Sequence, residues 1–239
     1  DVSAATDEAR LDLARAAAQA LLSQLRPQDR VAVLAASTSP ATLGRDAMGA
    51  ASKERVDELV GLLGKQTAGG ASNLEAALLR AVELLPRGKG TVIYIGDGRP
   101  TVGALLPGEL RDRLLRLGAL PRFYAVAVGS DANLELLGAL CDAGAGRGVV
   151  RIEDRPEAAR AALHLIERAA QPSLTEVRVA LGEEADVVYP EAPVALEGGE
   201  PLSIVARLRR DRSLAPTMLT ISGLRDGKPF TTQQPLVVR

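Results

Sequence analysis

The chain of 239 residues contains one cysteine and one histidine, and this scarcity excludes two kinds of site. Cys141 has no partner with which to form an internal disulfide bond. It lies in an apolar stretch with helical character, so we expect it to be a small buried hydrophobic side chain. His164 has no second imidazole to complete a zinc site, because histidine ligands normally occur in clusters. We therefore expect a structural or surface role for His164.

The chain also lacks an excess of charge of either sign and lacks a long apolar run. Its 29 lysines and arginines nearly balance 30 aspartates and glutamates, which leaves a net charge of −1. A nucleic-acid or anionic-membrane surface would need a basic stripe, so we expect neither partner. No apolar run approaches the length of a membrane span, and no cleavable signal peptide is recognisable. The apolar content of 46% is ordinary for a globular protein.

Motifs for nucleotide hydrolysis and for nucleophilic catalysis are missing as well. The chain has no Gly-x-x-x-x-Gly-Lys-Ser/Thr loop. The glycine-rich stretch 143–148 precedes a predicted strand, whereas a dinucleotide-binding loop follows a strand and opens a helix. Ser3 and Ser72 have no evident activating base. A hydrolase would need His164 or the carboxylates to work alone, so we expect a protein that is not an enzyme.

Residues 7–170 alternate helical and strand-like patterns. Apolar periodicity predicts helices at 7–25, 53–63, 73–85, 109–117, 134–141 and 156–169, and strands at 30–34, 41–43, 91–95, 123–128 and 149–152. The run 91–95 is apolar nearly throughout, which is typical of a strand covered on both faces. The alternation predicts an α/β fold with a doubly wound, mainly parallel sheet. Ligands of such sheets bind at the carboxyl ends of the strands.

After Gln171 the pattern changes to alternating polar and apolar residues separated by turn-forming pairs. This pattern predicts a small antiparallel β module of roughly five or six strands over residues 171–239. A module of about 70 residues buries a marginal core when it stands alone.

Three separated segments carry carboxylates and small hydroxyls at predicted strand ends or just before helices. They are Asp1-Val2-Ser3, the stretch 69–74 with Ser72, and the stretch 94–98 with Asp97. Mg²⁺ prefers oxygen ligands and usually takes one or two carboxylates together with water or an oxygen of a partner. A site of this kind has an open coordination position that suits an acidic group on another molecule. The three segments therefore predict a site for recognising a partner rather than a site for catalysis.

These residues resemble the metal-ion-dependent adhesion site of von Willebrand factor type A domains. The family pattern is Asp-x-Ser-x-Ser, then a Gly-Gly-Thr-Asn-like loop, then Thr-Asp-Gly. The matches are Asp1, Ser3, Ser72 in place of the threonine, and Asp97 with Gly98. The resemblance implies that Asp1, Ser3, Ser72 and Asp97 hold a metal ion. It also implies that the same four residues and Gly98 bind a partner protein through one of its acidic side chains.

Two positions depart from the family pattern. Ala5 stands where the pattern has its second serine, so one direct metal ligand is replaced by a side chain without oxygen. Gly96 stands where the pattern has the threonine before the aspartate. The resemblance implies Mg²⁺ as the cofactor, with Mn²⁺ or Ca²⁺ as alternatives, and Ala5 predicts that the ion is bound weakly.

Several segments of the second half resemble the inter-alpha-trypsin inhibitor heavy-chain group, in which a β-rich VIT domain precedes the type A domain. These segments are 126–130, 133–140, 172–177, 188–190, 196–200 and 221–223. The resemblance implies a type A-like domain over residues 1–170 and a β module over 171–239 that packs with a VIT domain upstream. We expect Asp1 to be an internal residue of a longer protein, with the central strand of the sheet before it. The resemblance also implies an extracytoplasmic location, which is secreted, periplasmic or at the cell surface.

Three functions remain open from the sequence. The leading hypothesis is a non-enzymatic protein-binding or adhesion module with a degenerate metal-ion-dependent adhesion site. The second is a metal-independent structural scaffold of a surface or secreted assembly, and a remote third is a hydrolase. The site residues also have purely structural interpretations. Ser72 followed by Glu75 matches a helix capping box, and Asp97 before glycine is common in turns.

Overall fold

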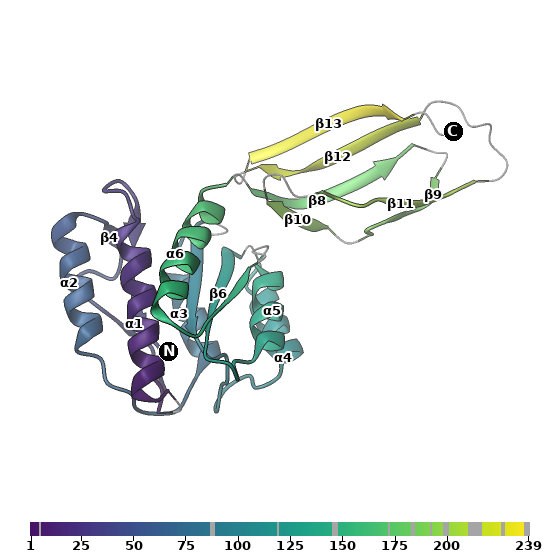
Figure 1. Cartoon of the computed structure of the whole chain (residues 1–239). Helices are drawn as coiled ribbons and strands as arrows, with labels where there is room; N and C mark the ends of the chain where they lie inside the picture. Colours follow the sequence, from purple (N-terminus) through teal and green to yellow (C-terminus); the bar gives the residue numbers. More distant parts are fainter. Residues whose placement is uncertain are drawn as a thin grey trace. The chain divides into compact units, whose positions relative to one another are not determined.

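The computed structural model describes residues 1–4, 6–86, 89–118, 120–144, 148–171, 173–182, 185–191, 193–197, 201–209, 217–225 and 228–236. Ala5, on which the expectation of weak metal binding depends, lies outside the described residues. The chain forms two compact units, Asp1–Ala170 and Gln171–Arg239 (Figure 1).

The helices of the first unit begin and end within a few residues of the predicted positions. They are α1 (Glu8–Ser23), α2 (Lys53–Gly64), α3 (Leu74–Glu83), α4 (Pro107–Leu115), α5 (Leu134–Ala143) and α6 (Arg155–Ala170). Capping side chains account for several of the starts. Asp7 accepts a hydrogen bond from the backbone N–H of Arg10 at the start of α1, and Ser52 does the same for Arg55 at the start of α2.

The principal sheet of this unit is parallel and has the strand order β5-β6-β7 in the described residues. Its strands are β5 (Thr91–Gly96), β6 (Arg122–Val128) and β7 (Val149–Ile152). Two short antiparallel pairs accompany it, β1 (Arg30–Val31) with β4 (Gly49–Ala50) and β2 (Leu34–Ala35) with β3 (Ala41–Thr42). The predicted strand at 30–34 is therefore divided into two, and β4 was not predicted. The α/β fold class with a mainly parallel sheet is confirmed.

Helices cover both faces of the parallel sheet (Figure 1). Phe123, Ala125 and Ala127 of β6 pack on one face into a core with α3, α4 and α5. The alternating residues of β6, Tyr124 and Val126 among them, pack on the other face with α1 and α6. Because both faces of β6 are buried, its sequence is a continuous apolar run and not an alternating one.

The two scarce residues of the chain lie where the sequence predicted. Cys141 is buried in the core on the face of α5 that meets the sheet. His164 is exposed on α6.

The second unit is antiparallel throughout its described residues, as the alternating pattern predicted. Its strands are β8 (Ser173–Leu181), β9 (Ala185–Tyr189), β10 (Val194–Glu197), β11 (Val205–Leu208), β12 (Thr217–Arg225) and β13 (Lys228–Leu236). They form a four-stranded sheet of order β10-β8-β12-β13 and a separate pair, β11-β9. In the part of the chain that the structure describes, each helix is too short or too polar to cross a membrane.

Candidate functional site

The three predicted loops meet at the carboxyl end of β5. The backbone nitrogen of Asp1 donates to the Ile95 carbonyl at 2.6 Å, which attaches the first loop to the end of this strand. The Ala4 nitrogen donates to the Gly70 carbonyl at 2.8 Å, which joins the first loop to the second. The structure thus brings the predicted site residues of separate segments to one place.

The carboxylate of Asp1 is the centre of this site. Its Oδ1 accepts the backbone N–H of Ser3 at 2.8 Å, while its Oδ2 accepts the hydroxyl of Ser72 at 3.0 Å. The contact between Asp1 and Ser72 joins residues 71 positions apart in the sequence. Hydrogen bonds to an ionised carboxylate are shorter and stronger than neutral ones, so this carboxylate is held firmly in one orientation.

Ser3 supplies an oxygen without a protein partner. Its side chain is 1% exposed, and its Oγ has no hydrogen-bond partner among the described residues. Leaving a buried hydroxyl unpaired costs about 1–3 kcal/mol, so such groups are uncommon and usually have an explanation. A ligand bound beside Asp1 would supply the missing partner.

Asp97 lies in the third loop and is 5% exposed. Its Oδ1 accepts the backbone N–H of Arg99 at 3.0 Å, which is the loop hydrogen bond expected of an aspartate in a turn. Its backbone carbonyl accepts the N–H of Asn133 at 2.8 Å, so the start of α5 is tied to this loop. Gly98 follows with φ +66°, and a Cβ there would lie 2.7 Å from the Cγ of Leu137. Only glycine fits this position without strain.

Ser72 has a different role from the structural alternative that the sequence offered. The N-cap of α3 is Asn73, whose side chain accepts the N–H of Ala76 at 3.0 Å. The interpretation of Ser72 as the N-cap is therefore wrong, because its hydroxyl is directed to Asp1. Thr101 of the third loop accepts the Ser72 N–H at 2.9 Å and donates its own N–H to the Ser72 carbonyl at 2.8 Å. These two bonds fix Ser72 at the site.

Tyr94 is a site residue that sequence reasoning missed. Its hydroxyl donates to the Oδ2 of Asp1 at 2.9 Å and accepts the N–H of Gly98 at 3.2 Å. Burial, followed by the charge of Asp97, raises the pKa of Tyr94, so the hydroxyl stays a neutral donor. The available signal was a tyrosine inside an apolar strand, since a buried tyrosine hydroxyl usually needs a partner.

Two kinds of side chain surround the site. Arg99 and Arg10 are cationic, and both form salt bridges to Asp131, at 3.3 and 2.8 Å. The loop that follows Thr101 exposes three large apolar side chains, which are Val102, Leu105 and Leu106, with exposed fractions of 37, 48 and 67%. The site is thus bordered by positive charge and by an apolar loop.

The donor set of the site fits a hard cation. Asp1 and Asp97 supply carboxylates, and Ser3 and Ser72 supply hydroxyls, which is the all-oxygen environment that Mg²⁺ prefers. The unpartnered Oγ of Ser3 is the observation that favours a bound ion at this place. In the described residues no group of three or more His, Cys, Asp or Glu side chains could hold a metal. This candidate site has two carboxylates and takes its other oxygens from serine hydroxyls.

A family comparison agrees with this architecture. Residues 1–99 match the model of the von Willebrand factor type A domain. The first unit has the fold of a von Willebrand factor type A domain. The matched residues contain all three loops of the site and end just after Gly98. No curated protein sequence matches the chain.

Solved structures share the fold at low sequence identity. A von Willebrand factor type A protein from Catenulispora acidiphila aligns with a TM-score of 0.70 and 15% identity over 98% of this chain. The type A protein VWA2 of Sulfolobus acidocaldarius, a paralog of ArnB, aligns with a TM-score of 0.59 and 18% identity over 99% of this chain. In each case the chain spans 63% of the length of the other protein.

A third structure aligns with a smaller share of the chain. An aerotolerance-related membrane protein from Bacteroides fragilis aligns with a TM-score of 0.54 and 14% identity over 70% of this chain and 95% of its own. Identities this low show a shared fold, and function has to be argued from the residues of the site.

Proposed function

We propose that the first unit is a non-enzymatic protein-binding module that holds a divalent cation at the end of β5 and binds an acidic side chain of another protein. Type A domains are commonly protein-interaction modules. Asp1, Ser3, Ser72 and Asp97 would hold the ion. When bound, the ion would supply a positive charge with an open coordination position for a carboxylate oxygen.

The observation that carries this proposal is the unpartnered, buried hydroxyl of Ser3, a residue whose backbone N–H bonds the Asp1 carboxylate. A serine that served only to fold the loop would be expected to use its hydroxyl in a turn or cap. Here the Ser3 backbone N–H already bonds Asp1, and the hydroxyl is left over. A buried oxygen with free lone pairs, on a residue bonded to a carboxylate, is a suitable ligand for a hard cation.

The surroundings of the site favour a protein as the partner. Val102, Leu105 and Leu106 are exposed on the segment that follows Thr101, and Thr101 is hydrogen-bonded to Ser72. Exposed apolar clusters rimmed by polar residues mark interaction sites. Arg99, with a side chain 53% exposed, adds positive charge that suits an acidic partner residue. We infer an epitope in which a glutamate or aspartate is flanked by apolar side chains.

One observation favours a second candidate, which is metal-independent binding. The Oδ2 of Asp1 accepts both the Ser72 and the Tyr94 hydroxyls, so that oxygen is satisfied by the protein alone. In this alternative the unit is a scaffold, and an acidic group would bind Arg99 directly without an ion.

A calorimetric titration with Mn²⁺ and with Mg²⁺ separates the two candidates. We expect saturable binding by the whole chain and its loss in Asp97→Ala, with circular dichroism showing that the variant stays folded. Asp112→Ala is the control, since Asp112 lies on α4 away from the three loops. Absence of binding at millimolar ion concentrations would contradict the metal-dependent proposal and favour the scaffold.

A peptide experiment tests the partner class. Synthetic peptides with one glutamate between leucines are compared with the same peptides carrying glutamine, with and without Mg²⁺. We expect binding of the glutamate peptide in Mg²⁺ and its weakening in Leu106→Asn. Leu163→Asn is the matched control, because Leu163 is 49% exposed on α6 and belongs to none of the loops. Equal binding of the two peptides would argue against recognition of a carboxylate.

Three finer assignments belong to the same proposal. Placement in the inter-alpha-trypsin inhibitor heavy-chain group, with a VIT domain that packs against the β module, has the segment resemblances as its support. A non-enzymatic role is supported by the exposure of His164 on α6, which contributes to none of the three loops. We propose an extracytoplasmic location, in line with the Bacteroides fragilis structure described as a membrane protein.

A further inference from the structure

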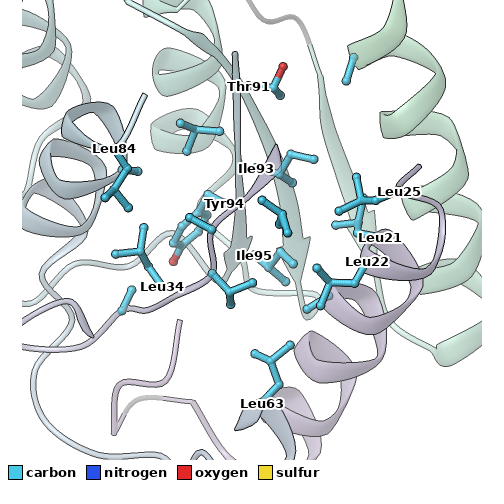
Figure 2. A pocket seen from close by; sticks show the side chains of 18 of the residues that line it. Leu21, Leu22, Leu25, Leu34, Leu63, Leu84, Thr91, Ile93, Tyr94 and Ile95 are labelled. Carbon is cyan, nitrogen blue, oxygen red and sulfur yellow. The ribbon is translucent and has the colours of Figure 1, made fainter. Parts of the chain in front are cut away.

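The side of the site that faces the interior of the first unit is apolar. Asp1 and Tyr94 border a cavity of about 730 Å³ that is lined mainly by apolar side chains. Figure 2 shows Leu34 and Ile93 with their side chains around this space. An ionised carboxylate would lose its hydration there at a high cost. An acidic side chain of a partner therefore reaches the site from the outer side, across the loops that surround Ser72.

Ser72 lies between two other segments of the chain. On one side, the N–H groups of Ala71 and Asn73 donate to a hydroxyl and a carbonyl of the segment 37–38, at 2.7 and 3.2 Å. On the other side, Ser72 donates its N–H to the Thr101 hydroxyl at 2.9 Å and accepts the Thr101 N–H at 2.8 Å. Successive residues of an extended chain bond to opposite sides. The two segments therefore border Ser72 from opposite sides.

The border that begins at Thr101 is apolar. It is held in place against the first turn of α3, because the Glu75 carboxylate accepts the N–H of Ala104 at 2.9 Å and Ala104 itself is buried. The large side chains that this border exposes are those of Val102, Leu105 and Leu106. A partner that lies on this side gains apolar contact area.

The opposite border is small and neutral. It consists of the stretches 36–42 and 67–73, neither of which contains a charged residue. Thr38 and Ser39 are exposed, as are the first four residues of the second stretch. Gly70 has φ +76°, and a Cβ there would lie 2.7 Å from the Thr38 Oγ1, so glycine lets the two stretches pack together. This border offers hydroxyls and backbone groups, and little apolar area.

We propose that the site distinguishes the two sides of the partner's acidic residue. The partner is an extended protein segment with large apolar side chains on one side of its glutamate or aspartate and small, uncharged polar residues on the other. The apolar side packs on residues 102–106, and the small side lies on residues 67–70. A charged side chain on the small side would lose water against a surface without a counterion. This inference rests on the proposed function and adds to it an order of residues in the partner.

Peptides of opposite order test the inference. Leu-Leu-Glu-Ser-Ser and Ser-Ser-Glu-Leu-Leu have the same composition, and acetylated and amidated ends remove their terminal charges. Each is compared in Mg²⁺ with its glutamine version and with Leu-Leu-Glu-Leu-Leu. We expect one order to bind at least as tightly as the symmetric peptide and on the order of tenfold more tightly than its reverse, since only one order places the leucines on the apolar border.

Two further measurements locate the preference on the protein. Replacing both Leu105 and Leu106 by asparagine should bring the affinities of the two orders together, whereas Leu163→Asn, an exposed substitution on α6, should leave their ratio unchanged. A photoreactive leucine in the tighter peptide should crosslink to residues 102–106. Crosslinks to residues 67–70 would overturn the inference.

The outcomes separate this inference from the proposed function. Binding that needs glutamate but is equal for the two orders would overturn the order of residues and leave the proposed function standing. Peptides that bind no better with glutamate than with glutamine would remove the proposed function and this inference with it.

Discussion

Removing the hydroxyl of Tyr94 is the sharpest test of how the site is held together. In Tyr94→Phe the ring and its packing stay, while two hydrogen bonds are lost, one to the Oδ2 of Asp1 and one from the N–H of Gly98. A hydrogen bond to a charged group contributes about 1.5–3 kcal/mol, and the buried N–H left without an acceptor costs about 1–3 kcal/mol. Shared relaxation makes the two effects less than additive, so we expect a loss of about 3 kcal/mol in the free energy of unfolding.

Chemical denaturation measures this loss, and thermal unfolding should show a lower midpoint by roughly 2–4 °C for each kcal/mol. Tyr189→Phe is the matched control, because Tyr189 is 55% exposed in the second unit. That substitution should change stability by less than about 0.5 kcal/mol. A Tyr94→Phe protein as stable as the parent would refute the assignment of Tyr94 as the residue that orients Asp1.

Three further predictions concern the same region. Ala5→Ser should tighten Mn²⁺ binding in a calorimetric titration, because an added hydroxyl replaces a water ligand, and equal or undetectable binding in both proteins would point to an abandoned site. Gly98→Ala should destabilise the fold by roughly 1–3 kcal/mol in urea unfolding, since a side chain at φ +66° is strained and meets Leu137, whereas Gly108→Ala in open space should not. The salt bridge to Arg113 lowers the pKa of Glu75, so its contribution to stability is complete above the unfolded pKa and is lost as the pH falls through the folded value. Unfolding followed from about pH 6 to pH 3 should therefore be less pH-dependent in Glu75→Gln, and an unchanged slope would contradict this.

The sequence predicted the layers of the first unit because apolar spacing reports burial directly. The strand at 123–128 and the helix at 134–141 appear within two residues of their observed bounds, since each buries a continuous apolar surface. The strand at 30–34 was less predictable. It divides into β1 and β2, which pair with separate two-residue partners, and such short pairings leave little pattern in the sequence.

The candidate site was predictable in its members and not in its contacts. Asp1, Ser72 and Asp97 could be selected because each follows a strand or precedes a helix. The sequence pattern favoured Ser72 as the helix cap, whereas Asn73 is the cap in the structure, and the two are hard to distinguish because both residue types cap well. The contribution of Tyr94 was hidden since its ring fits an apolar strand, and the direction of its hydroxyl depends on a loop 93 residues away.

Gly96 lies so close to Asp1 and to the Tyr94 ring that the site has no room for a larger residue at this position. A Cβ there would come within 2.6 Å of the Asp1 Cβ and closer still to the Tyr94 hydroxyl. Threonine at this position, as in the family pattern, and the Tyr94 hydroxyl therefore exclude each other. Gly96→Thr should therefore be damaging in the present protein, and Tyr94→Leu should relieve its contact with the tyrosine ring while the contact with the Asp1 Cβ remains.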